Sequence, residues 1–558
     1  MAELTIDKAL QRGIEAHKVG KVQEAEQYYT AILKVQSKHP DANHNMGVLA
    51  VGVGKVQESL PFFKTALAVN PATAQYWLSY IDALIRLDRI DEAKTMLDQA
   101  KSKGAKGDGF DELAQRLNEV IGKPLEATHA EPSKGQVESL INLYSQGHLQ
   151  QALEQVITLL QQFPNSSMLH NISGAVHKAL GRLDASVNAY KKALSIKPDY
   201  DEAYYNMGNA LKEQGKLQDA LEAYRKALII KPNYPKAYYN MGVTLKEKGQ
   251  LEEAIEAYTK AISIKPDYAE AYNNMGNALK EQGKLDEAIE ACNKALSIKP
   301  DFADAYWNLS GIVENISESI KWVEKCLDAN PKHLEAKLTF SALKYYDGNE
   351  DEFNSLMKSS LKDHGFTRSF AWAFGLPKLP TLHFHRWALF DHMTDLSKKD
   401  RPFYEFGVWR AEAFRYLIKT FKKGYGFDTF EGIPEDWHNQ KAGTYTSDGN
   451  VPKIKGGKFI VGKFEDTLPG FFAEKRPTAS IINFDADLYS STICALNFAK
   501  PVIDQHTILI FDEFLMNDYW EEDEYKALEE FCTDNDYTYE VLAISFFTKQ
   551  VAVKIVGI

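Results

Sequence analysis

The sequence predicts an array of repeated helix pairs in its first part and an α/β domain with a largely parallel sheet in its last part. Proline, glycine and alanine recur every 34 residues between residues 165 and 310, which indicates a helical repeat. Beyond about residue 400, short apolar runs alternate with helical stretches, as strands and helices do in a doubly wound sheet. Acidic residues directly after two of these runs predict a polar site at one edge of the sheet.

Composition sets limits on the class of protein. The 558 residues suffice for several domains, and 44% hydrophobic residues argue against wholesale disorder. The four cysteines are widely spaced, which fits neither a disulfide framework nor a zinc site. No apolar run approaches the roughly 20 residues of a membrane span, so we expect no membrane span and a cytoplasmic setting. The net charge is −12 and neither half is basic, which argues against a nucleic-acid partner.

The repeat unit reads AYYNMGNALKEQGKLQDALEAYRKALIIKP, two amphipathic helices joined at a KEQGK turn. Gly208 lets the helices pack closely, and Pro232 stops the second one. A 34-residue helix pair of this kind resembles the tetratricopeptide (TPR) repeat. We predict a degenerate array over residues 4–121, a linker over 122–135 and a regular array over 136–349, with a further domain over 350–558. TPR proteins as a family bind protein partners in a concave groove.

Asparagine recurs on the first helices of the regular repeats. Its amides would hold the backbone of an extended protein or peptide partner in the groove, or else serve helix-to-helix hydrogen bonds alone. These positions are Asn206, Asn209, Asn240, Asn274, Asn277 and Asn308.

Seven apolar runs predict the strands of the last domain. Helical stretches separate the first five, and the last two follow each other so closely that they must form a hairpin. The runs are RPFYEFGVW, YGFDTFEG, GKFIVG, TASIINFD, HTILIFD, YTYEVLAI and QVAVKIV.

Two of these runs end in acidic pairs. Asp485 and Asp487 follow one run, and Asp512 with Glu513 follows the next. Neighbouring strands lie about 4.8 Å apart, so the four carboxyl groups would converge. Such a cluster needs a cation or must share protons, and hard divalent cations such as Mg²⁺ prefer oxygen ligands. The acidic stretch DYWEEDE at 518–524 is predicted to be a solvated helix start instead.

Other strand ends predict cofactor contacts. Glu405 and Gly407 close the first run, where a glycine lets backbone approach a ligand at the following helix N-terminus. Asp428 ends the second run, a place where an acid commonly binds ribose hydroxyls. Phe464 follows the third run, where an aromatic ring is ordinary core.

A closer resemblance covers about residues 365–556. YEFGVWRAEAF, GFDTFEGIPE, VGKFEDTLPGFF, NFDADLYSST and ILIFDEF stand in the order seen in the macrocin O-methyltransferase (TylF-type) family. That family consists of metal-dependent enzymes that methylate sugar hydroxyls. The resemblance implies a Rossmann-like class I methyltransferase domain that uses S-adenosylmethionine (SAM). Phe464 lies where the family packs the adenine, and the alternative for Phe464 is an ordinary core residue. The resemblance also implies that Asp485, Asp512 and Glu513 are metal ligands and Asp487 the general base, although the roles of Asp485 and Asp487 are interchangeable on the sequence.

Two departures from the family pattern stand out. Ala411 and Glu412 replace small glycines, and Glu412 needs room or must point outward. Asp512-Glu513 replaces paired aspartates.

The sequence also predicts roles for one loop and for three histidines. The polar loop 434–458 is a candidate lid, whose Trp437, His438 and Tyr445 would contact the acceptor. Structural roles are expected for three histidines that precede the sheet, namely His383, His385 and His392.

The sequence therefore favours a SAM- and Mg²⁺-dependent O-methyltransferase with a TPR interaction module. Its acceptor would be a sugar hydroxyl, free, nucleotide-linked or part of a glycan. The alternative is a TPR scaffold whose methyltransferase-like domain is inactive. A TPR-linked glycosyltransferase ranks below both, because the roughly 200 residues after the array are too few for two Rossmann-like domains.

Overall fold

The computed structural model describes residues 5–87, 89–103, 108–121 and 131–557. The chain forms two compact units, Met1–Glu138 with Leu159–Ser166, and Ser139–Thr158 with Ser167–Ile558. Of the predicted linker, residues 122–130 lie outside the described residues, and a helix begins at Lys134. The predicted domain boundaries remain predictions.

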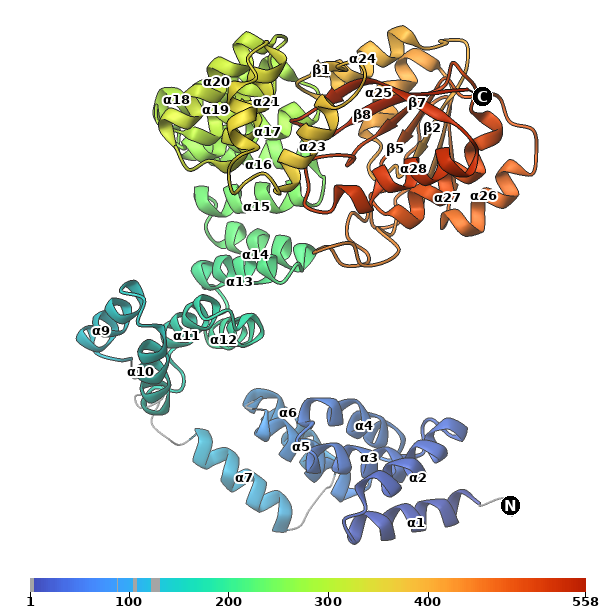
Figure 1. Cartoon of the computed structure of the whole chain (residues 1–558). Coiled ribbons are helices and arrows are strands. Elements are labelled where there is room, and N and C mark those ends of the chain that lie inside the picture. The colour runs from blue at the N-terminus through green and yellow to red at the C-terminus, as the bar shows by residue number, and fades with distance from the viewer. Residues whose placement is uncertain (1–4, 88, 104–107, 122–130, 558) are drawn as a thin grey trace. The chain divides into compact units, whose positions relative to one another are not determined.

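The first unit consists of helices that pack in sequential pairs (Figure 1). Gly13 and Gly47 lie on first helices, where an added Cβ would stand 2.6 Å from Tyr29 and 2.5 Å from Phe63. The weak repeats predicted here therefore use the same close helix contact as the regular ones. The helices are α1 (Ile6–Lys18), α2 (Val22–Val35), α3 (Pro40–Gly52), α4 (Val56–Val69), α5 (Ala74–Arg86), α6 (Ile90–Ser102) and α7 (Asp108–Ile121).

The second unit carries the regular repeats. At Gly208 an added Cβ would lie 2.6 Å from the ring of Tyr224, which is fully buried, so only glycine permits this approach. Gly174 and Gly242 stand in the same way against Tyr190 and Tyr258. The predicted helical array is thus confirmed. Its helices are α9 (Lys134–Ser145), α10 (Leu149–Gln162), α11 (Ser167–Ala179), α12 (Leu183–Ile196), α13 (Asp201–Glu213), α14 (Leu217–Ile230), α15 (Pro235–Glu247), α16 (Leu251–Ile264), α17 (Ala269–Glu281), α18 (Leu285–Ile298), α19 (Ala303–Ser310), α20 (Ile316–Ala329) and α21 (Leu334–Tyr346).

An eight-stranded sheet follows the array. Each of the seven predicted runs contains a strand, and a three-residue edge strand, too short to leave a sequence pattern, precedes them. The strands are β1 (Thr381–His383), β2 (Phe403–Phe406), β3 (Gly424–Asp428), β4 (Gly457–Val461), β5 (Ile481–Phe484), β6 (Ile508–Phe511), β7 (Thr538–Ser545) and β8 (Val551–Val556).

The strand order is β1-β7-β8-β6-β5-β2-β3-β4. Strands β2 to β6 pair in parallel, whereas β8 runs antiparallel to β6 and β7. The order reverses direction between β2 and β5, which makes their carboxyl ends a topological switch point where ligands bind in open α/β sheets.

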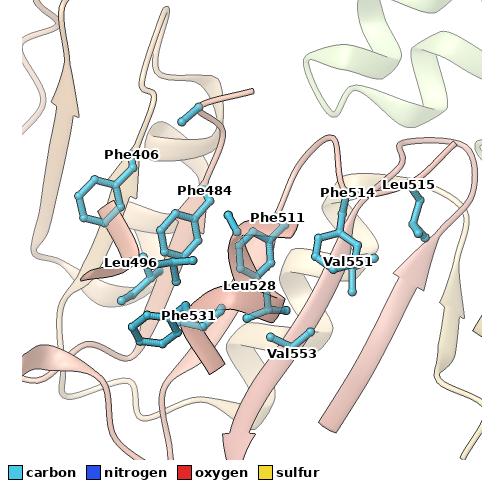
Figure 2. Packing of buried hydrophobic residues seen from close by; sticks show 14 of the residues in the cluster. Phe406, Phe484, Leu496, Phe511, Phe514, Leu515, Leu528, Phe531, Val551 and Val553 are labelled. Atoms are coloured by element: carbon cyan, nitrogen blue, oxygen red, sulfur yellow. The ribbon is translucent and has the colours of Figure 1, made fainter. Parts of the chain in front are cut away.

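Helices cover both faces of this sheet. On one face the rings of Phe406, Phe484 and Phe511 stack from strand to strand, with centroids 5.4 and 4.9 Å apart (Figure 2). They pack against Leu496 of α27 and Leu528 of α28. The other face packs against α24 and α25. The helices are α22 (Asp351–Leu356), α23 (Gly365–Phe374), α24 (Arg386–Leu396), α25 (Glu412–Phe421), α26 (Phe464–Phe472), α27 (Tyr489–Ala499) and α28 (Glu524–Asp534), with short 3-10 turns η1 (Lys500–Val502) and η2 (Trp520–Glu522).

The connection from β3 to β4 is the predicted loop and contains no helix, contrary to the expectation of helices between each of the first five strands. Over the described residues, no helix is both long enough and apolar enough to cross a membrane.

The array contacts the sheet domain through the turns between its paired helices. At Gly249, after α15, an added Cβ would stand 2.3 Å from the indole of Trp409, and the Arg410 Nε donates to the Lys248 carbonyl (2.7 Å). At Gly283, after α17, an added Cβ would lie 3.2 Å from the Trp387 indole. The Trp387 Nε1 donates to the Lys280 carbonyl (2.9 Å).

A third contact follows α19, where Gly311 lies against Phe547 of the β7–β8 connection. The ring of Phe547 also lies 5.1 Å from that of Trp307. The corresponding turn glycines of the preceding repeats, Gly181 and Gly215, have nothing within 4 Å of an added Cβ. Some turns of the array thus contact the sheet domain, whereas, among the described residues, the corresponding turn glycines of preceding repeats do not.

Candidate active site

A cavity of about 220 Å³ opens at the carboxyl ends of the central strands. It brings together seven of the predicted site residues, Gly407, Asp428, Phe464, Asp485, Asp487, Asp512 and Glu513. A second cavity of about 390 Å³ adjoins it and shares Arg386, Trp409, Asp485 and Glu513. Glu405, the eighth predicted residue, lines this second cavity. The sheet thus gathers residues that lie up to 108 positions apart in the sequence (405 to 513).

Gly407 is required by the close approach of two strand ends. Its φ is +86°, and an added Cβ would stand 1.8 Å from the Asp485 carbonyl oxygen. No other residue fits there without moving β5 away from β2.

The Asp428 carboxylate organises the turn after β2. One oxygen accepts from the backbone N–H groups of Val408 and Trp409 (both 2.6 Å), and the other accepts from Phe430 (2.6 Å). A carboxylate offers about four acceptor positions, so one position remains, on the oxygen that accepts from Phe430. Asp428 therefore fixes the loop and can still accept from a ligand hydroxyl.

Two other predicted cofactor residues differ in their setting. Phe464 begins α26, belongs to the core and also lines the first cavity, and its contact with an adenine stays a prediction. Glu405 is 1% exposed in β2, and its Oε2 has no hydrogen-bond partner among the described residues. Burial, and then the Asp428 charge, raise the pKa of Glu405 well above its usual range.

Asp485 and Asp487 face the cavity without a hydrogen-bonded cation. Burial raises the pKa of both groups well above the ordinary range, and Asp512 adds to the effect on Asp485 as Glu513 does for Asp487. Asp487 adopts a left-handed conformation with φ +59°, a strained state that aspartate tolerates better than most residues. Burial and neighbouring carboxylates raise the pKa of both groups, so the structure leaves their roles interchangeable.

Asp512 and Glu513 each form an ion pair with a basic side chain of the protein. The Arg386 Nη2 donates to both Asp512 oxygens (3.0 and 2.9 Å), and Gln550 also donates to Asp512. The Lys549 Nζ donates to Glu513 (2.8 Å). Sequence reasoning missed Arg386, Lys549 and Gln550, because they lie outside the acidic motifs and only the fold brings them to the site.

The acidic stretch 518–524 is not a solvated helix start at its end, so that prediction was wrong for its last residues. Asp523 is 5% exposed and Glu524 fully buried. The Glu524 Oε2 accepts from the Glu513 N–H (3.2 Å), and burial followed by the Asp487 charge raises the Glu524 pKa well above its usual range. Glu524, the first residue of α28, therefore adds a buried carboxyl group beside the predicted acidic residues.

The predicted loop is tied down beside the site. Trp437 and His438 do not line either cavity, contrary to prediction; both side chains contact Asp523, the His438 Nε2 at 2.8 Å. Tyr445 does line the first cavity, and its ring lies 5.5 Å from that of Trp409. Asp448 forms an ion pair with Lys248 of the array (3.3 Å).

The three histidines have structural contacts, as predicted. His383 and His392 contact each other through ring nitrogens (2.9 Å). The Nδ1 of His385 accepts from the Ala388 N–H and caps α24. Burial, together with the Lys280 charge, lowers the pKa of His385 to about 4.

The substituted glycine positions have a defined geometry. Ala411 has φ +66° and ψ +30°, in the left-handed region where glycine is favoured. Glu412 is half-buried and lines the second cavity, so the room that it needs is provided there.

The donor set allows a test of whether a divalent cation fits. Among the described residues, no three His, Cys, Asp or Glu side chains stand in a ready-made metal-binding arrangement. The predicted trio Asp485, Asp512 and Glu513 shares the cavity, but two of its members are ion-paired. Nevertheless carboxyl groups outnumber cations in the lining of the first cavity, and a hard divalent cation would offset this excess of negative charge. The metal role stays a prediction.

The asparagines of the groove mostly bond to neighbouring helices. Their Nδ2 groups donate to side chains of the preceding repeat, and one of these bonds joins Asn308 to Asn273 (2.8 Å). The others run from Asn206 to Asn171, from Asn240 to Tyr205 and Asn209, and from Asn274 to Tyr239. Asn277 differs, because it has no hydrogen bond among the described residues and lines the second cavity.

Comparisons with known proteins identify the class of the repeats. Residues 174–215, 208–249 and 244–283 match the family described as TPR repeat, and residues 269–302 and 44–107 match families described as tetratricopeptide repeat. These segments of the chain are therefore tetratricopeptide repeats, a module for protein–protein interaction.

Individual proteins resemble parts of the chain. The chain is 25% identical over 201 residues to a peroxisomal targeting signal receptor of Kluyveromyces lactis, covering 34% of this chain and 35% of that protein. The chain thus spans about a third of the length of this curated relative. Among solved structures, MamA is 30% identical over 29% of this chain and 95% of its own (TM-score 0.28). YrrB, a TPR protein with an unusual peptide-binding site, is 22% identical over 32% and 95% (TM-score 0.29).

Proposed function

We propose that the sheet domain is a SAM-dependent O-methyltransferase that acts on a sugar hydroxyl, joined to a TPR module that binds a protein partner. The observation that carries the proposal is the first cavity, at the switch point of a parallel sheet that ends in an antiparallel hairpin. That strand layout is typical of class I SAM-dependent methyltransferases.

The residues around the cavity fit the cofactor. Gly407 keeps the loop after β2 close to β5, and Asp428 offers its remaining acceptor position to a ribose hydroxyl. Phe464 presents an apolar ring for an adenine. A methyl transfer from SAM needs in-line placement of the acceptor, which positioned side chains provide.

The acidic residues supply the proton chemistry. A sugar hydroxyl becomes a good nucleophile only as its proton leaves, and a nearby carboxylate collects it. Asp487, with Asp485 as the alternative, faces the cavity for this task. Mg²⁺, held by Asp485 with Asp512 and Glu513, would supply Lewis acidity and lower the hydroxyl pKa.

The direct test is transfer of a labelled methyl group from SAM to a panel of free, nucleotide-linked and glycan sugars. We expect turnover with the native chain and a loss of at least about 100-fold in Asp487→Asn, the usual scale for a general base. SAM binding without turnover on any sugar would favour the alternative, a TPR scaffold with an inactive domain.

The alternative has one structural observation in its favour. Arg386 and Lys549 occupy two of the three carboxylates that the metal would use, so the site is partly neutralised without an ion.

A further inference from the structure

The TPR array supplies side chains to the second cavity. Asn277, Lys280 and Glu281, in the last two turns of α17, line it together with Arg386 and Asp485 of the sheet domain. The cavity is therefore composite, and it adjoins the proposed methyl-transfer site directly.

Lys280 breaks a regular pattern of ion pairs along the array. We call this pattern the lysine–glutamate ladder; it joins each repeat to the next through Lys178–Glu213 (2.5 Å), Lys212–Glu247 (3.4 Å) and Lys246–Glu281 (2.8 Å). Lys280 is the next lysine of the series, 34 residues after Lys246.

The shortened helix α19 explains why Lys280 lacks a partner. First helices of the regular repeats have 13 residues, whereas α19 has eight and ends at Ser310. The glutamate that would continue the ladder is missing, and position 315 is an asparagine that caps α20. Phe547 packs at the shortened turn instead.

The Lys280 ammonium is consequently available to a ligand. Among the described residues it has no hydrogen bond and no ion pair, and the neighbouring Glu281 carboxylate is held by Lys246. Burial lowers the pKa of Lys280, and the nearby Glu281 charge only partly opposes this effect. Asn277, one helical turn before Lys280, adds an unused amide to the same wall.

We propose that this wall of α17 is part of the acceptor pocket, and that Lys280 and Asn277 bind an oxyanion, a carboxylate or a phosphate, on an acidic sugar. The identity of the sugar as methyl acceptor rests on the proposed function, whereas the oxyanion site itself does not. Trp387 and Trp409 of the same cavity offer apolar rings beside which a sugar can lie. The array is then a substrate-binding element as well as an interaction module.

Three small probes test the oxyanion site with the full chain. Saturation-transfer NMR compares methyl glucuronide, glucose 6-phosphate and uncharged methyl glucoside. We expect at least one charged sugar to bind 10-fold or more tightly than the glucoside, and the stronger of the two identifies carboxylate or phosphate as the source. Lys280→Met should abolish this preference, and Lys280→Arg should retain it.

The matched control is Lys212→Met, which removes a ladder lysine away from the cavity and should leave the preference unchanged. If Lys280→Met does not fold, Asn277→Asp places a repelling carboxylate in the wall and should weaken the charged sugars alone. Equal binding of all three sugars, or an equal effect of Lys212→Met, would overturn the proposal. SAM affinity is measured in the same variants: absence of SAM binding with retained sugar preference refutes the methyltransferase and leaves the oxyanion site standing.

Discussion

Replacing Gly249 by alanine tests whether the array positions the proposed cofactor loop. The new Cβ would stand 2.3 Å from the Trp409 indole, against about 3.5 Å for an ordinary carbon contact, so the ring must move by about 1 Å. The Trp409 N–H donates to Asp428 and its Nε1 donates to the Thr446 carbonyl (3.2 Å), which transmits the shift to both walls of the first cavity.

Gly215→Ala is the matched control. Gly215 occupies the same turn position with φ +74°, close to the +69° of Gly249, but an added Cβ there meets nothing within 4 Å. Both variants carry the cost of a left-handed alanine, about 1–2 kcal/mol, so their melting temperatures report that shared cost. Misplacement by about 1 Å can cost on the order of 100-fold in a site.

Titration calorimetry with SAM separates the two variants. We expect Gly249→Ala to weaken SAM binding by about 10-fold or more, within the range set by such a displacement, while Gly215→Ala binds like the native chain. Equal SAM affinity in both variants would refute the reasoning that the array holds the loop in place.

Three further predictions concern strain, charge and pH. Ala411→Gly should stabilise the chain by about 1 kcal/mol in chemical unfolding, since φ +66° favours glycine; a destabilised variant would show that Ala411 is not strained. Removal of divalent cations with EDTA should abolish methyl transfer and added Mg²⁺ restore it, whereas full activity in EDTA would mean that Arg386 and Lys549 suffice as counter-charges. His385→Asn keeps a helix cap but removes a group whose pKa is about 4 when folded and 6.5 ordinarily. Because only the unfolded chain binds the proton between these values, the native chain should lose stability relative to the variant as pH falls from 6.5 to 4, by up to about 3 kcal/mol; parallel melting curves at all pH values would contradict this.

Periodic features of the chain were predictable because local sequence determines them. Gly208 and Tyr224 form one close contact that repeats with the 34-residue period, and each apolar run of the sheet is bounded by polar residues. The acidic edge was predictable for the same reason, since strand ends in a parallel sheet share one side.

Residues that reach the site from elsewhere were not predictable. Arg386, Lys549 and Glu524 belong to elements whose approach depends on tertiary packing, and no local pattern marks them. The role of Lys280 depends on the absence of a partner one repeat later, which becomes visible only when α19 is seen to end at Ser310. Trp437 and His438 looked available in the sequence, but the buried Asp523 binds both.

The central claim is that the first cavity binds SAM. Isothermal titration of SAM into the full chain, with and without Mg²⁺, tests it most directly, with Asp428→Ala as the site variant and Asp395→Ala, an exposed residue paired with Lys399, as the control. The account predicts saturable binding to the native chain and to Asp395→Ala, and loss of that binding in Asp428→Ala. Absence of SAM binding to the native chain under both conditions would contradict it.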